Sequence, residues 1–173
     1  AGITSQNLQW LLANRGADAA ISLREAIIAA NNTGAPVRIN FAIPGVGVHT
    51  ITLGAALPMI TAPVSLDAST DDSFAANGSR PAVVIDGNNL NAHGLSLGAG
   101  SGGSVIRGLV IRGFQQDGIH IQAGSDGNVI AGNYLGRLTP AGTAAAVGNN
   151  GSGIAVYSAN NLIGGTTPAD LNV

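Results

Sequence analysis

Arg112, Asp117 and His120 bring a guanidinium, a carboxylate and an imidazole into one short stretch of the chain. Such groups can bind a neutral or acidic sugar, and an imidazole beside a carboxylate can move a proton. Hydrolysis of a glycosidic bond, however, uses two carboxylates that flank the bond. The sequence shows no paired carboxylates and no acidic cluster that repeats. An ordinary solvated surface is therefore the favoured interpretation, and a catalytic role for these three residues is the alternative.

Asp71 and Asp72 are the candidate metal ligands. With Asp67 and Asn77 nearby, they could offer oxygen atoms to Ca²⁺. Their spacing matches no recognised calcium loop, so a polar loop is favoured. The chain has no cysteine, which excludes disulfides and thiolate-bound zinc. We therefore expect no cofactor, with calcium as the alternative.

Other polar and aromatic residues carry weaker signals. His49 and His93 have no partner at metal-ligand spacing and are expected on the surface. Asp86, which precedes a glycine, predicts a turn. Tyr134 and Tyr157 are expected to face outward, where loose surface packing is favoured over a platform for stacking a sugar.

Short apolar segments that repeat along the chain must position these residues. One series comprises 94–97, 118–121 and 153–156, and a second comprises 104–111, 128–135 and 161–165. Two phased series that recur about every two dozen residues indicate a repeat fold, in which successive repeats stack. The longer excursions at 68–80 and 137–148 are predicted to project from the stack.

Alternation along the repeated segments predicts which side chains point inward. Leu95, Ile119 and Ile154 should lie in one file, about 4.8 Å apart if the repeats stack in register. His120 should then point outward, between Ser96 of the preceding repeat and Ala155 of the next.

Three asparagines hold defined places in the repeats, two of them equivalent and the third, Asn133, at the position that Leu109 takes one repeat earlier. Asn128 and Asn161 share a position at a turn into a strand, where stacked amides can bond one another and the turn backbone. Asn133 should point inward with its amide bonded.

The N-terminal part predicts helices. Ser22 and Glu25 form a capping box before an apolar face, and Gly34 ends the helix. A further short helix is predicted over 5–14, with Ser5 as its cap. We therefore expect a helical cap over residues 1–35 and stacked strands over 36–173, together forming one structural domain.

Composition limits the partners. The 173 residues are 9% charged with a net charge of −2, and no basic run marks a nucleic-acid site. No apolar run approaches the roughly 20 residues of a membrane-spanning helix, so we expect no membrane insertion. The final Asn172-Val173 resembles the opening Asn128-Val129 of an earlier repeat. We expect an open last repeat that forms an end-to-end homo-oligomer.

Several motifs together resemble one group of proteins. They are Ser22-Leu-Arg-Glu-Ala-Ile27, Ile43-Pro-Gly-Val-Gly-Val48, Thr50-Ile-Thr-Leu53, Leu57-Pro-Met-Ile-Thr61, Ile106-Arg-Gly-Leu-Val-Ile111, Gly127-Asn-Val-Ile-Ala-Gly-Asn-Tyr-Leu-Gly136 and Asn161-Leu-Ile-Gly-Gly-Thr-Thr-Pro168. Over roughly residues 22–173 the chain resembles pectate-lyase-like proteins with a right-handed parallel β-helix, and within them bacterial secreted and surface proteins with the first of these motifs. The resemblance implies an all-β, right-handed single-stranded parallel β-helix solenoid with an N-terminal helical cap, and a secreted or cell-surface location.

Two functions follow as expectations. The first is a non-catalytic module of an exported bacterial surface protein, acting as a rigid scaffold, an adhesive or a contact for polysaccharide or cell-surface glycan. The alternative is the N-terminal part of a polysaccharide lyase or glycoside hydrolase of that class, with its decisive residues either beyond Val173 or on the face that carries Asp117 and His120.

Overall fold

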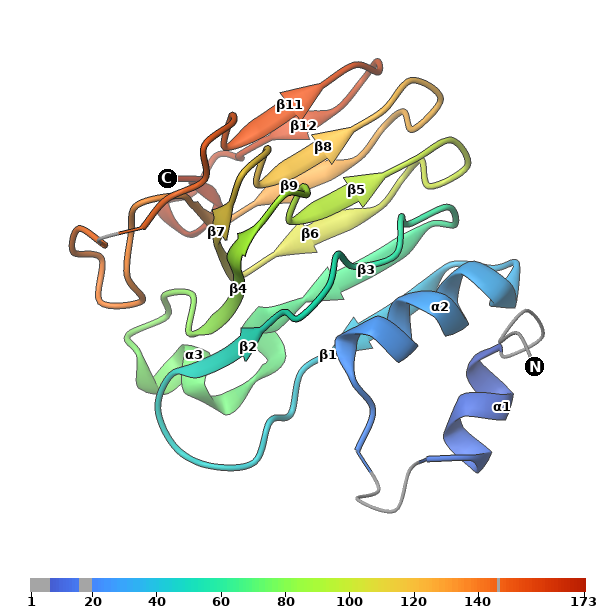
Figure 1. Ribbon diagram of the computed structural model, residues 1–173, viewed down its shortest axis with the longest axis horizontal. Helices are drawn as coiled ribbons and strands as arrows, with labels where there is room; N and C mark the ends of the chain where they lie inside the picture. The colour runs from blue at the N-terminus through green and yellow to red at the C-terminus, as the bar shows by residue number, and fades with distance from the viewer. Residues whose placement is uncertain (1–6, 16–19, 146) are drawn as a thin grey trace.

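The strands of the protein form three parallel sheets, and within a sheet successive strands, such as β5, β8 and β11, lie one above another in Figure 1. The computed structural model describes residues 7–15, 20–145 and 147–173. The five-stranded sheet has the order β1 (Val37–Asn40), β3 (Val64–Asp67), β6 (Val105–Arg107), β9 (Val129–Ala131) and β12 (Leu162–Ile163). The four-stranded sheet has the order β10 (Tyr134–Leu135), β7 (Leu109–Phe114), β4 (Val83–Leu90) and β2 (His49–Thr52). The three-stranded sheet has the order β11 (Ile154–Val156), β8 (Ile119–Ile121) and β5 (Leu95–Leu97).

Helices accompany the sheets. They are α1 (Leu8–Ala13), α2 (Leu23–Thr33) and α3 (Asp72–Ala76), with 3₁₀ turns η1 (Ala68–Thr70) and η2 (Pro168–Asp170). None of the helices in the described part of the chain has the length and apolar character needed to cross a membrane.

The structure corrects the predicted fold class. Three parallel sheets of five, four and three strands, with helices beside them, make an α/β-type arrangement. The prediction of an all-β, right-handed single-stranded parallel β-helix solenoid is therefore wrong, and the pectate-lyase-like and adhesive descriptions attached to that class are withdrawn with it. The physical reason is that a repeat spacing specifies which strands pair, whereas the helices arise from local capping that the repeat does not report.

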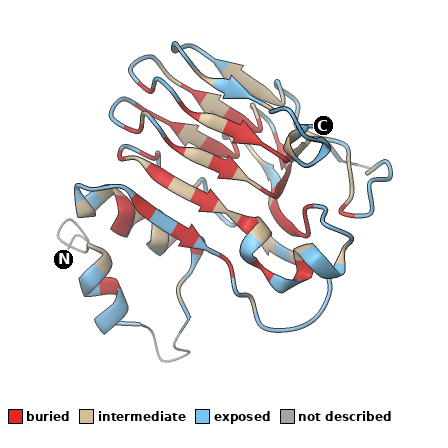
Figure 2. Cartoon of the chain, turned by 180° about the vertical axis from the view of Figure 1, so that it is seen from behind, coloured by how far each residue is buried: buried red, intermediate tan, exposed pale blue. Residues whose placement is uncertain are grey.

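The apolar file predicted from the repeats is present. Leu95 pairs with Ile119, and Ile119 pairs with Ile154, in the register of the three-stranded sheet. Leu95 and Ile119 are fully buried, whereas Ile154 in the last strand is half-buried. Figure 2 shows the same trend, with buried residues in the inner strands and exposure growing towards the last ones.

Helix α2 covers the first strand of the five-stranded sheet. The predicted capping box is confirmed, because Ser22 accepts from the Glu25 N–H while Glu25 accepts from the Ser22 N–H. Its Leu23, Ile27 and Ala30 lie in the same core as β1. Gly34 ends the helix with a positive φ of 71°, which a glycine adopts without steric penalty. In α1 the cap is Asn7, and the proposed cap Ser5 lies outside the described residues.

The 68–80 excursion is not the plain polar loop that the sequence predicts. Asp67 and Asp71 each accept a hydrogen bond from the backbone N–H two residues on, which caps η1 and α3. Short carboxylates in this position favour a helical turn over an open loop.

Buried asparagines bond the bends between strands, as predicted. Asn128 accepts from the Ser104 N–H at 3.0 Å, and its own N–H donates to Asn161 at 2.9 Å. Asn133 accepts from the Leu109 N–H at 3.1 Å and donates to carbonyls of its own and the preceding repeat. Both side chains are fully buried.

Replacing Asn128 by alanine should lower the free energy of unfolding by about 3 kcal/mol. The buried Ser104 N–H would lose its acceptor, and a buried donor without a partner costs about 1–3 kcal/mol by itself, with a cavity in addition. Urea unfolding measures the change. Asn150→Ala, at an exposed asparagine, is the control and should shift stability by less than about 0.5 kcal/mol. Equal stability of the two variants would contradict the role of the Asn128 amide.

The last strands leave an apolar surface exposed. Val156, Leu162 and Ile163 of β11 and β12 are 41%, 54% and 44% exposed, and both strands lie at sheet edges. Unpaired strand edges recruit other strands. Because α2 covers β1 at the opposite end, the predicted homo-oligomer should join the β11–β12 ends of two copies.

Sedimentation at increasing protein concentration should therefore show a reversible dimer. Ile163→Lys should weaken the dimer because it places a charge in the apolar contact. Val46→Lys, at a position 99% exposed near the opposite end of the sheets, should leave the dimer unchanged. A monomer at all concentrations would refute the expectation.

Candidate functional site

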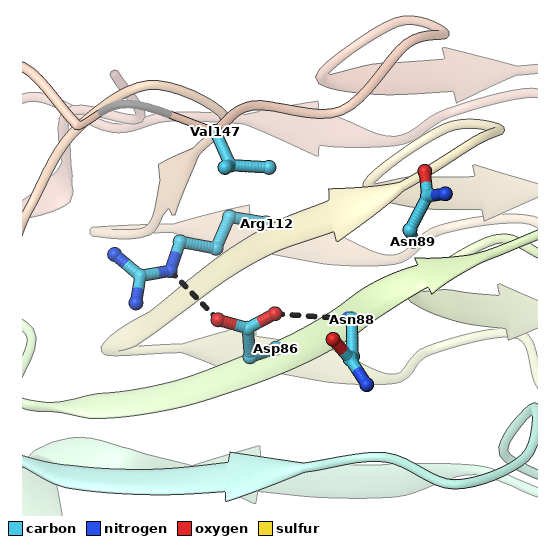
Figure 3. A pocket seen from close by; sticks show the side chains of 5 residues that line it. All are labelled: Asp86, Asn88, Asn89, Arg112 and Val147. Atoms are coloured by element: carbon cyan, nitrogen blue, oxygen red, sulfur yellow. Dashed lines mark hydrogen bonds and ion pairs between the residues drawn. The ribbon is translucent and has the colours of Figure 1, made fainter.

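A polar hollow of about 320 Å³ lies over the four-stranded sheet, lined by Asp86, Asn88, Asn89, Arg112 and Val147. Figure 3 shows the Arg112 side chain reaching toward Asp86. Arg112 Nε donates to Asp86 Oδ2 at 3.2 Å, and Asp86 Oδ1 accepts from the Asn88 N–H at 2.9 Å. The carboxylate and the guanidinium therefore hold each other in place, and their charges cancel.

The asparagines of the hollow adopt an unusual backbone conformation. Asn88 and Asn89 have positive φ values of 47° and 67°, in the left-handed region that asparagine tolerates better than most residues. The register between β4 and β7 shifts at this point, between Asp86 and Leu90. Both asparagines are exposed, so this bulge presents two amide groups at the rim of the hollow.

The structure separates the three residues that the sequence brought together. Arg112 lies on β7 and pairs with Asp86 in the four-stranded sheet. Asp117 lies just before β8, and His120 lies within β8. This strand belongs to the three-stranded sheet. His120 has Ser96 and Ala155 as its register partners, as predicted.

Asp117 lies close to two histidines rather than one. Its Oδ2 lies 2.9 Å from His120 Nδ1 and 3.2 Å from His93 Nδ1. The two imidazole rings stack with centroids 4.0 Å apart, and Tyr157 lies 5.1 Å from His120 on a tilted plane. Asp117 Oδ1 accepts from the Ser152 N–H at 2.8 Å, which fixes the carboxylate. We call His93, Asp117, His120 and Tyr157 the histidine cluster.

Two glycines bring His93 and Asp117 into contact. Gly94 and Gly118 follow these residues at the start of β5 and β8, and the Gly94 N–H donates to the Asp117 carbonyl at 2.9 Å. A Cβ at Gly94 would lie 2.5 Å from the Gly118 carbonyl oxygen, so only glycine permits this approach. The prediction that His93 is an unpartnered surface histidine is wrong. The sequence did carry a signal for this contact: His93 and Asp117 occupy equivalent positions in their repeats, since each directly precedes a glycine at the start of a strand.

Burial and neighbouring charges shift the protonation of the cluster. Burial would raise the pKa of Asp117, but hydrogen bonds from His120 and the Ser152 N–H outweigh it and lower that pKa below its usual value. Burial lowers the pKa of His93, and His120 lowers it further, whereas Asp117 opposes the shift without reversing it. Asp117 is therefore held as a carboxylate and His93 as a neutral imidazole at neutral pH.

The Asp71 carboxylate has a structural role, because its hydrogen bonds hold neighbouring backbone segments in place. Burial would raise the pKa of this carboxyl, but it is lowered overall because Asp71 accepts from the Ile43 N–H and from Ser73. His49 Nε2 lies 3.7 Å from Asp71, and Asp72 completes a group that offers three ligand atoms. The prediction that His49 has no partner at metal-ligand spacing is therefore also wrong.

The remaining candidates are placed as follows. Tyr134 lies half-buried on β10 in the four-stranded sheet, and Tyr157, a member of the histidine cluster, is 65% exposed. The expected turn at Asp86 is instead an interior position of the long strand β4.

Comparison with known proteins adds no relative. No family model, no curated protein and no solved structure matches the chain. The site therefore has to be interpreted from its own chemistry.

Nuclear magnetic resonance titration of the histidine rings should find the pKa of His93 below 6.5, its ordinary value. His120→Gln should raise that pKa, because a neighbouring positive charge is removed, and Asp117→Asn should lower it further, because a stabilising negative charge is removed. Asp72→Asn, at an exposed carboxylate of α3, should leave it unchanged. A His93 pKa that does not respond to either cluster variant would contradict this account.

Proposed function

We propose that the chain is a non-catalytic module that contacts polysaccharide along the face running from the polar hollow to the histidine cluster. The observation that carries the proposal is the set of groups lining the hollow: a carboxylate, a guanidinium, two amides and an exposed valine. Sugar hydroxyls both donate and accept hydrogen bonds, and these side chains offer both kinds of partner. Few convergent polar groups beside an apolar wall are typical of ligand sites.

The hollow and the cluster are close enough for one oligosaccharide. Arg112 and Asp117 are joined by a chain that spans at most about 18 Å when fully extended. Alongside it, the Gln115 N–H donates to the Leu90 carbonyl and the Gln116 amide donates to Asn91. The two neighbouring segments thus form one polar path that ends at the rings of His93, His120 and Tyr157.

The charge of the hollow selects among glycans. Asp86 and Arg112 neutralise one another, so no free cation among the lining residues attracts a uronate. The favoured ligand is therefore a neutral polysaccharide. The ion pair also holds both side chains before a ligand arrives, which reduces the entropy lost on binding.

Binding should be measured by calorimetry against a panel of neutral and uronate oligosaccharides. Asn89→Gly removes one amide yet keeps a residue that accepts positive φ, and it should weaken binding about fivefold to tenfold. Asn160→Gly is the matched control, because Asn160 also has a positive φ of 59° and is exposed in the turn between β11 and β12. No binding to any glycan, or equal loss in both variants, would refute the proposal.

A second candidate is a polysaccharide lyase or hydrolase that uses Asp117 and His120. The specific observation in its favour is the 2.9 Å contact between Asp117 Oδ2 and His120 Nδ1, because a carboxylate there orients the imidazole and leaves Nε2 to exchange a proton. Incubation with the same panel, followed by assays of new reducing ends and unsaturated ends, distinguishes the two. Turnover that disappears in His120→Gln would replace the binding module with the enzyme. The expected secreted or cell-surface location stays a prediction in either case.

A further inference from the structure

We propose that His93, Asp117 and His120 form a binding site for one divalent transition-metal ion of the zinc type. This inference does not require glycan binding, although the histidine cluster also lies at one end of the proposed glycan face. It concerns residues on and before strands β8 and β5 of the three-stranded sheet and uses none of the residues that line the polar hollow.

The spacing of the donor atoms fits such an ion. With metal–ligand bonds of about 2.0–2.1 Å, neighbouring ligand atoms of a tetrahedral site lie about 3.3 Å apart. Asp117 Oδ2 lies 3.2 Å from His93 Nδ1 and 2.9 Å from His120 Nδ1, and all three atoms lie within 4.8 Å of one another. Small side-chain rotations are therefore sufficient to place an ion among them.

The positions of the protons on the three side chains allow a metal ion to bind there. The ion takes the place of the proton that lies between His120 Nδ1 and Asp117 Oδ2, and neutral His120 then carries its proton on Nε2. His93 Nδ1 already presents a lone pair, which accepts the Asp117 N–H over 3.2 Å. This hydrogen bond is long, and the ion takes the place of the Asp117 N–H at the lone pair of His93 Nδ1.

The surroundings hold the ligands in position. The Ser152 N–H binds the second oxygen of Asp117, and the stacked rings together with Tyr157 restrict the rotation of His120. Such partners behind the ligands increase metal affinity. The side chains of His93, Asp117 and His120 remain 24%, 16% and 18% exposed, so water can reach the ion as a fourth ligand.

The donor types select the metal. Two imidazole nitrogens and one carboxylate oxygen suit Zn²⁺, Cu²⁺ or Ni²⁺ better than Ca²⁺ or Mg²⁺, which prefer oxygen ligands. The other histidine–carboxylate group, at His49, Asp71 and Asp72, fits less well because Asp71 already accepts hydrogen bonds from Ile43 and Ser73. It supplies a matched control.

Calorimetric titration of the tag-free chain with Zn²⁺ tests the proposal. We expect one ion per chain, and a loss of affinity of about tenfold or more in His93→Gln, His120→Gln and Asp117→Asn. His49→Gln should leave the affinity unchanged, and Ca²⁺ should neither bind at this site nor compete. Circular dichroism without metal verifies that each variant is folded.

Histidine resonances provide a second measurement on the wild-type protein. Zn²⁺ should shift the ring signals of His93 and His120 together and leave those of His49 in place. The proposal is overturned by any of three results: no binding of Zn²⁺ to the wild type, loss of binding in His49→Gln with retention in His120→Gln, or ring shifts at His49 alone.

Discussion

The bends between strands impose the constraint on which the rest of this structure depends. Each repeat turns in the interior, where backbone N–H and carbonyl groups are out of reach of water and must find partners. Asn128 and Asn133 supply them, since each side-chain amide accepts from a backbone N–H of the preceding repeat and donates to the side chain of an asparagine of the next. One asparagine side chain thereby fixes the positions of three successive repeats relative to one another. The apolar files can then pack in register, and the outward side chains of equivalent positions come to lie side by side.

This regularity explains which features could be predicted from the sequence. The pairing of Leu95 with Ile119, the stacked asparagines and the Ser22–Glu25 capping box each follow from a residue type at a repeated or local spacing. The fold class was mispredicted because the spacing carries no signal for α3, which depends on the cap at Asp71. The assembly of the site was only partly predictable. The outward direction of His120 follows from alternation, whereas the contact of His93 with Asp117 requires comparing the residues that precede two glycines in different repeats.

The same comparison explains why the candidate trio divides. Arg112 and Asp86 occupy equivalent positions of β7 and β4, so the sheet sets the guanidinium directly beside a carboxylate. His93 and Asp117 occupy equivalent positions before β5 and β8, so a second carboxylate meets an imidazole. In a stack of parallel repeats, a residue can find its partner one repeat away, as Arg112 does in Asp86, as well as along its own segment, as His120 does in Asp117. Arg112, although near Asp117 in sequence, is thus bound elsewhere.

Irregular strand pairing and left-handed backbone conformations occur together on the outer face of the four-stranded sheet. The other strand pairs keep a continuous register, whereas the β4–β7 pairing shifts where Asn88 and Asn89 adopt left-handed conformations. A non-glycine residue held in such a conformation costs about 1 kcal/mol or more. Glycine would remove that strain but also the two amides that border the hollow. The strain is therefore confined to residues that offer hydrogen-bonding groups to solvent, while the buried core that could least accommodate it remains regular. A surface that served only to cover the core would gain stability from glycine at both positions. Ser79 and Asn160 adopt the same conformation in other exposed turns, so the conformation by itself does not assign the two amides to a ligand.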